Sequence, residues 1–231
     1  MQDDHHEHEA LAHELNDPEL RAAYAAPYDH YKTGIIANIL GWLLVTSGTL
    51  MYGRKPSYGK FKAIEVIARI PYQSWEVASY TLLTAFYGNE KKAIDLTKTG
   101  MFSRMAQDNE TMHVVVITKI CKERKCVGPI RHMLIPLIFA FFYFWTIYLL
   151  YMLHRKSALE LNYLFENHAF HQYQQFLDEN EAALKERMCM SDFLTLYGRH
   201  VRSEYELFET IRNDELIHRN RSIRELEART C

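Results

Sequence analysis

The stretch ETMH at residues 110–113 and the stretch ELIH at residues 215–218 share the pattern Glu-x-x-His. Residues three apart in an α-helix lie on the same face, so in each stretch the carboxylate and the imidazole can point at one centre. A single Glu-x-x-His is a weak signal, because both residue types are common on protein surfaces. The repetition of the pattern in the second half of the chain is what allows a fold to be predicted.

Two further glutamates divide the chain into similar halves. Glu65 precedes Glu110 by 45 residues, and Glu166 precedes Glu215 by 49 residues, so each interval suits one helical hairpin. A four-helix bundle that binds two iron or manganese ions uses one glutamate from each of two helices and a Glu-x-x-His from each of the others. We therefore predict an all-α, ferritin-like four-helix bundle around two non-haem iron ions. The predicted metal ligands are Glu65, Glu110, His113, Glu166, Glu215 and His218.

The neighbours of these residues suggest supporting roles. A histidine that binds a metal usually donates its other N–H to an acceptor. Asn109 and Asp214 each precede a motif glutamate, and each could accept from the histidine of the other half. Tyr173 lies seven residues after Glu166, two helical turns on, and therefore on the same face. A core tyrosine is the default interpretation in a chain with 15 of them, and a redox role is the alternative.

The composition is typical of long helices. Glycine and proline are scarce, at 9 and 6 residues, while aromatic residues reach 13%. The net charge of −2 gives no general attraction to nucleic acid. Residues 1–27 are polar, acidic and rich in histidine, which predicts a mobile tail or a short amphipathic helix. Residues 28–231 are predicted to form a single domain, with helices over 58–86, kinked at Pro71, and over 89–123, 157–187 and 191–227.

Two apolar blocks, residues 31–52 and 133–153, raise the question of a membrane. The second is long enough to span a bilayer and the first nearly so. If 133–153 crossed, with or without the other block, Glu65 and Glu166 would lie on opposite sides and could not share a centre. We therefore predict that both blocks lie in the plane of the membrane surface, which implies a lipophilic substrate. A buried bundle helix remains the alternative for residues 31–52.

Four stretches resemble motifs of the alternative oxidase family, which includes mitochondrial and plastid terminal quinol oxidases. DNETMHVV (108–115) resembles the family's NERMH, and RNDELIHR (212–219) resembles its RADExxHR. FENHAFHQY (165–173) resembles LEEEAxxxY, although only the first of the three glutamates is kept, and AIEVIARIP (63–71) resembles LExVAxVP. The resemblance runs from about residue 30 to residue 225, and the order and spacing of the motifs are specific.

The resemblance implies a role for each matching residue. Glu110 and Glu215 match the carboxylates that bridge the two irons, and Tyr173 matches a tyrosine used in oxygen chemistry. The family also implies ubiquinol-type quinol and O2 as partners, attachment to one face of the mitochondrial inner membrane, and a possible homodimer or association with a respiratory complex. The positions that match the quinol pocket are Lys60, Phe61, Ile64, Ala169 and Gln172.

The sequence also departs from the family pattern, mainly around the pocket. Lys60 stands where the family has an arginine, and the two side chains are not equivalent at such sites. The LRxPTD-like stretch of the first helix and a tryptophan before the last helix have no clear match. We expect a quinol oxidase that reduces O2 to water without pumping protons. The alternatives are a weakened, oxidase-like accessory subunit of a respiratory complex and a diiron hydroxylase of quinone biosynthesis.

Overall fold

The computed structural model of the protein describes residues 2–227, with side chains from residue 6 onward, and is almost entirely helical over that range. No strand occurs in the described part of the chain, where one isolated bridge joins Met188 to Ser203. The all-α prediction is therefore confirmed. The elements are α1 (Gln2–Glu14), α2 (Pro18–Ala25), α3 (Ile35–Tyr52), α4 (Tyr58–Ala68), α5 (Ile70–Phe86), α6 (Glu90–Glu123), the π-helical turn η1 (Ile130–Leu134), α7 (Ile135–Lys185), α8 (Asp192–Leu196) and α9 (Glu204–Glu227).

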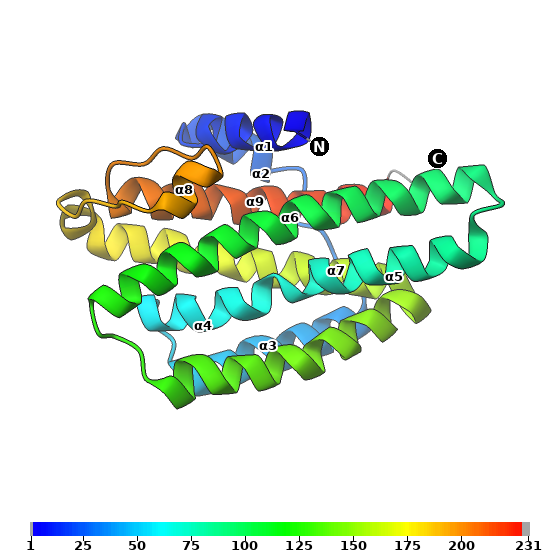
Figure 1. Cartoon of the computed structure of the whole chain (residues 1–231), viewed down its shortest axis with the longest axis horizontal. Helices are drawn as coiled ribbons and strands as arrows, with labels where there is room; N and C mark the ends of the chain where they lie inside the picture. The colour runs from blue at the N-terminus through cyan, green and yellow to red at the C-terminus, as the bar shows by residue number, and fades with distance from the viewer. Residues whose placement is uncertain (1, 228–231) are drawn as a thin grey trace.

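The centre of the molecule is a four-helix bundle, as predicted. It consists of α4 continued by α5, α6, the second half of α7, and α9 (Figure 1). The closest packing joins α7 to α9 and α5 to α6. In both views α6 returns antiparallel to α4 and α5, and α9 returns antiparallel to the second half of α7.

Two predicted helices are divided in the structure. The helix expected over 58–86 ends as α4 at Ala68, and α5 begins at Ile70 with Pro71 in its first turn. Proline suits that position because a first-turn N–H has no partner within the helix. The helix expected over 191–227 becomes α8 and α9, separated by a loop. Both breaks lie outside the turns that carry the motif glutamates.

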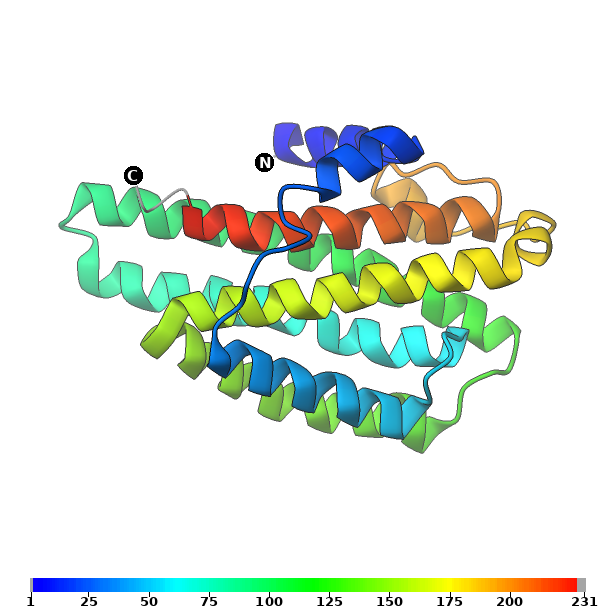
Figure 2. The ribbon, with the colours of Figure 1, turned by 180° about the vertical axis from the view of Figure 1, so that it is seen from behind.

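A reversal of the chain at His154 divides α7 into two halves. His154 has a non-helical backbone (φ −150°, ψ 70°), and the ribbon turns back on itself there (Figure 2). The apolar half before His154 corresponds to the predicted block 133–153, and the half after it to the predicted helix 157–187. The reversal returns the chain to the bundle, which brings Glu166 to the centre.

Helix α3 and the first half of α7 lie side by side along one outer face of the bundle (Figures 1 and 2). These are the two helices of the described chain that are long and apolar enough to cross a membrane. Only 17% of the apolar segment of α3 and 22% of that of α7 are buried. We call their exposed surface the apolar face. Its large side chains include Ile35, Ile39, Trp42, Leu43, Leu50, Leu137, Ile138, Phe141, Phe142, Trp145, Leu149 and Leu153.

The N-terminal segment forms helices α1 and α2, which pack on α9. Ala12 and Leu15 are buried against Leu216 and Ile217. Asp17 caps α2 by accepting from the backbone N–H groups of Glu19 and Leu20. The sequence predicted either a mobile tail or a short amphipathic helix for residues 1–27, and the structure has helices. The apolar residues of these helices cover α9, the helix that carries Glu215 and His218.

Candidate metal centre

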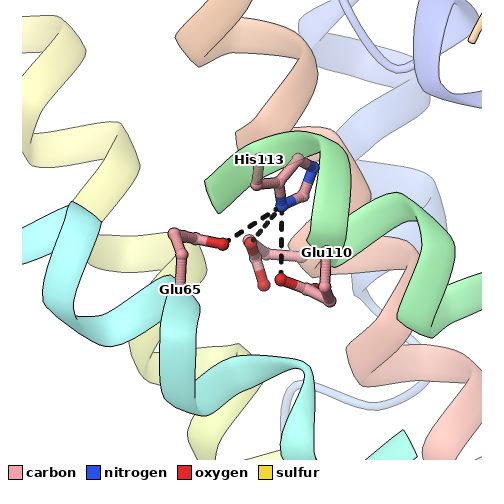
Figure 3. Close-up of side chains that lie close together, drawn as sticks. Glu65, Glu110 and His113 are labelled. Atoms are coloured by element: carbon pink, nitrogen blue, oxygen red, sulfur yellow. Dashed lines mark ion pairs between the residues drawn. The ribbon is translucent and has the colours of Figure 1, made fainter. Parts of the chain in front are cut away.

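The six predicted ligands meet in the middle of the bundle, and all are buried. They come from four helices: Glu65 from α4, Glu110 and His113 from α6, Glu166 from α7, and Glu215 and His218 from α9. Figure 3 shows the side chains of Glu65, Glu110 and His113 pointing toward one another from α4 and α6. The helical spacing of Glu-x-x-His puts both motif side chains on the inner face, which is the reason predicted from the sequence.

The distances between these side chains are short. His113 Nδ1 lies 3.3 Å from Glu65 Oε2, 3.3 Å from Glu110 Oε2 and 3.6 Å from Glu215 Oε1. On the other side of the centre, His218 Nδ1 lies 2.8 Å from Glu110 Oε1. The two histidines therefore approach the same carboxylate, Glu110, through different oxygens.

The ligand atoms form two overlapping groups. In each group the oxygen and nitrogen atoms lie within 4.8 Å of one another, close enough to surround one ion. One group contains Glu65 and His113, the other contains Glu166 and His218, and both contain Glu110 and Glu215. The two shared carboxylates are the pair that the family resemblance places in the bridging positions.

Most polar atoms that face the centre make no hydrogen bond with any of the described residues. Both oxygens of Glu110 and of Glu215, one oxygen each of Glu65 and Glu166, Nδ1 of His113 and both ring nitrogens of His218 are buried without one, although His218 Nδ1 and Glu110 Oε1 lie close together. A buried polar atom without a partner is costly, and a buried charge is more so. Two cations would satisfy these atoms, and the set of four carboxylates and two imidazoles suits iron. The residues present therefore fit the diiron group.

The electrostatics of the protein alone reflect this crowding of carboxylates. Burial, then the nearby Glu110 charge, raises the pKa of Glu65 to about 7, and burial raises the pKa of Glu166 to about 8. Burial also raises the pKa of Glu215 well above its usual range, with Glu110 adding to the effect. For Glu110 the pKa is lowered instead, because the neighbouring His113 and His218 outweigh burial. Bound cations would favour the ionised form of all four.

The outer partner predicted for His113 lies where expected, whereas the one for His218 does not. Asp214 Oδ2 is 2.9 Å from His113 Nε2, so the carboxylate accepts from this nitrogen and leaves Nδ1 free to face the centre. Asn109 Oδ1, which was expected to accept from His218, has no hydrogen-bond partner among the described residues. Nδ1 of His218 faces Glu110 instead, and its Nε2 likewise makes no hydrogen bond with any described residue.

Several partners of the ligands were not predicted from the sequence. Glu166 Oε1 accepts from Tyr72 Oη at 2.7 Å and from Asn162 Nδ2 at 3.1 Å. Asn162 also donates to Ser222 Oγ, which in turn donates to the backbone carbonyl of His218. Asn162 lies one helical turn before Glu166, a spacing that could have suggested a contact. No sequence signal connects Tyr72, on α5, with Glu166 on α7.

Tyr173 lies between the centre and a neighbouring cavity. Its hydroxyl donates to Glu65 Oε1, and its ring stacks on Phe61 with centroids 4.1 Å apart. Burial, followed by the Glu65 charge, raises the pKa of Tyr173 well above its usual range, so the hydroxyl keeps its proton. Direct contact with a predicted metal ligand distinguishes Tyr173 from an ordinary core tyrosine.

The cavity has a volume of about 250 Å³ and lies between α3, α4 and both halves of α7. All five residues matched to the quinol pocket line it, together with Tyr173. His168, which the sequence analysis did not select, lines it as well. A more open groove between α3 and the first half of α7 shares Leu44, Ser47, Ile135 and Phe139 with the cavity, so the two adjoin each other beside the apolar face.

Lys60 lines this cavity, but its ammonium group is already fully engaged. Nζ donates to Gln172 Oε1 at 2.6 Å and to the backbone carbonyls of Gly53 and Arg54 at 3.0 and 3.2 Å. An ammonium group has three protons, so none remains for a ligand. Lys60 therefore joins α4 to α7 and to the end of α3, and reaches a ligand only through Gln172.

Comparison with known proteins gives one match. The family model described as alternative oxidase matches residues 51–225, a range that contains all six ligand positions and Tyr173. No curated protein and no solved structure matches the sequence significantly.

Proposed function

The chain belongs to the alternative oxidase family, a family of membrane-associated diiron oxidoreductases that use quinol and O2, and on this premise we propose that it is itself a quinol oxidase. The proposed reaction oxidises two quinols and reduces one O2 to two water molecules, without pumping protons. Its proposed cofactor is a pair of non-haem irons held by Glu65, Glu110, His113, Glu166, Glu215 and His218. One observation carries the proposal: Tyr173 lines the cavity and also donates a hydrogen bond to Glu65, a predicted metal ligand.

The cavity would hold the quinol head group beside Tyr173. Its wall is mainly apolar, with Ala169, Ile64 and Phe61 beside the aromatic ring of Tyr173, so it suits a flat ring with few polar groups. The adjoining groove beside the apolar face would give room for a hydrophobic tail. The irons, when bound, would supply the redox chemistry by which O2 accepts four electrons.

Tyr173 is the proposed route for a quinol proton. Its hydroxyl donates to Glu65 Oε1, so passing that proton to the carboxylate and taking one from a quinol hydroxyl would return Tyr173 to its starting state. The two quinols together release the four electrons and four protons that two water molecules require. Burial of Tyr173 and Glu65 keeps bulk water away from this path.

The apolar face is the proposed surface of membrane attachment. The four helices that carry the six ligands lie together on one side of α3 and the first half of α7, so the centre forms without either apolar helix crossing the bilayer. The adjoining groove opens between these same two helices, which would let a lipid-soluble quinol enter from the bilayer. A location at the mitochondrial inner membrane follows from the family resemblance and is part of the proposal.

Charges placed on the apolar face should release the protein from membranes. Phe141 and Phe142 are 62% and 65% exposed, and burial of one such side chain contributes roughly 1.5–3 kcal/mol. We expect Phe141→Asp/Phe142→Asp to reduce co-sedimentation with phospholipid vesicles by at least tenfold, since about 1.4 kcal/mol corresponds to a factor of ten. Leu196→Asp, a control on exposed α8, should sediment like wild type. Equal sedimentation of the double variant would contradict attachment through this face.

The activity can be tested with purified, iron-loaded protein and a ubiquinol analogue by measuring cyanide-insensitive O2 uptake. Ala169 is 7% exposed and lines the cavity, so Ala169→Phe fills the space proposed for the head group. We expect its KM for quinol to rise at least tenfold, about 1.4 kcal/mol, with unchanged iron content. Ala169→Ser, the size-matched control, should stay close to wild type. No quinol-dependent uptake by wild-type protein that holds two irons would reject the oxidase and favour an accessory subunit or a hydroxylase.

A further inference from the structure

Helix α1 reaches the outer side of the metal centre through two polar side chains. His8 is 5% exposed and Glu9 lies beside it, although the run HHEHE (5–9) is strongly polar. On the same side of α9, the loop before that helix brings in Arg199, which is 4% exposed. Neither His8 nor Arg199 is part of any motif recognised in the sequence.

These two residues meet at Asp214. His8 Nε2 is 2.9 Å from Asp214 Oδ1, and Arg199 donates to both carboxylate oxygens, at 2.5 Å from Nη1 and 3.0 Å from Nη2. Arg199 also donates to both oxygens of Glu9, at 2.9 and 2.7 Å. Glu9 thus anchors α1 to the same arginine. With His113 on Oδ2, the buried carboxylate of Asp214 has donors from three different elements.

We propose that His8 and Arg199 are positioning residues for the metal centre, which act by holding Asp214 as the acceptor for His113. This inference rests on the proposed diiron site. A carboxylate can only accept, so both histidines present an N–H to it, and His113 must then present Nδ1 to Glu65 and Glu110. Without His8 or Arg199, Asp214 would be a buried charge with fewer partners, free to turn away from His113.

The contacts of His8 and Arg199 with Asp214 should not affect the binding of the two ions equally. His113 belongs to the group with Glu65, whereas the group with Glu166 contains His218 and not His113. Loss of the hydrogen bonds to Asp214 should therefore weaken the binding of one ion far more than that of the other. The ring of His8 lies 5.6 Å from that of His218, centroid to centroid, so a substitution that keeps a ring at position 8 preserves this neighbour.

The test is an anaerobic titration of the metal-free full chain with Co²⁺, followed by visible absorption and by metal analysis after desalting. His8→Phe keeps a ring but removes the donor to Asp214, and we expect the affinity for one of the two ions to fall about 10–100-fold. After loading with two equivalents of cobalt and desalting, this variant should retain one cobalt per chain where wild type retains two. His8→Gln, whose amide can donate to Asp214, should restore most of the lost affinity. His6→Phe, on the exposed side of α1, should bind like wild type.

Several outcomes would overturn the inference. Two equally tight cobalt ions in His8→Phe would do so, and so would equal losses in His8→Phe and His8→Gln, which would indicate packing rather than hydrogen bonding. Arg199→Leu removes the second support from a different element and should reproduce the one-ion loss if His8→Phe fails to fold. A wild-type chain that binds no cobalt would reject the metal centre itself and with it the proposed function, whereas a chain that binds two ions independently of His8 and Arg199 would reject only this inference.

Discussion

Glu110→Ala and Glu215→Ala are each expected to reduce bound iron from two ions per chain to almost none. Both carboxylates belong to both ligand groups, so either change removes a donor from each ion at once. Quinol oxidation should fall by at least roughly 10³-fold, because bound metal contributes several kcal/mol to transition-state stabilisation and each 1.4 kcal/mol is a factor of ten. Iron analysis and O2 uptake measure the two effects.

Loss of iron through substitution of Glu215 should not be accompanied by loss of fold. The carboxyl pKa values of Glu65 and Glu166 are about 7 and about 8 in the folded metal-free protein, above the usual 4.5. The contribution of these two groups to the stability of the metal-free fold is therefore fully present below about pH 4.5 and is lost as the pH rises through about 7 to 8, because each group is then ionised more easily in the unfolded chain than in the buried centre. Glu215→Gln removes one of the crowded carboxylates, so its metal-free form should melt at or above the wild-type temperature at pH 8.

A matched control separates the centre from the rest of α9. Glu209 lies on the same helix as Glu215, is partly exposed and pairs with Arg212. Glu209→Ala should keep two irons and wild-type O2 uptake. If Glu215→Ala retained two tightly bound irons, the assignment of the shared carboxylates would be wrong, whatever its activity.

Tyr173→Phe is expected to keep both irons and to lose most of its activity. The substitution preserves the ring that stacks on Phe61 and removes only the hydroxyl that donates to Glu65. Positioned proton transfer contributes about 10²–10⁴-fold to enzymatic rates, so kcat should fall by that factor while KM for quinol changes little. Steady-state O2 uptake over a range of quinol concentrations gives the two constants.

The control for Tyr173→Phe is another tyrosine outside the cavity. Tyr205 on α9 is partly buried but does not line the cavity, and Tyr205→Phe should leave kcat unchanged. A Tyr173→Phe enzyme with wild-type kcat would show that the hydroxyl carries no proton in the rate-limiting step. If Tyr173→Phe bound no iron, the role of the Tyr173 hydroxyl would instead be to hold Glu65 in position for metal binding.

The predictions from sequence worked best where helical periodicity applies. Glu110 with His113, and Glu215 with His218, lie on inner faces because a spacing of three residues is nearly one helical turn. The same reasoning placed Tyr173 on the face of Glu166. The prediction for Asn109 had no such basis, since it required the direction in which the His218 ring turns, and that direction depends on where Glu110 lies on a different helix.

Other features depend on contacts between distant parts of the chain. His8 and Arg199 are 206 and 15 residues from Asp214, and Tyr72 is 94 residues from Glu166. Lys60 illustrates the same limit, because the resemblance placed it in the pocket while the carbonyls of Gly53 and Arg54 decide that its protons are unavailable. None of these pairs has a periodic spacing that would reveal it.

The sequence by itself determined the all-α class, the four glutamates and two histidines of the centre, and the two apolar helices, since these follow from helical period and from side-chain chemistry. Only the tertiary structure decided that α1 packs on α9, that the chain reverses at His154, and that the cavity at Tyr173 adjoins a groove beside the apolar face. The physical reason is that period and composition are local properties of the chain, whereas the partner of a buried polar group is set by which distant helix packs beside it.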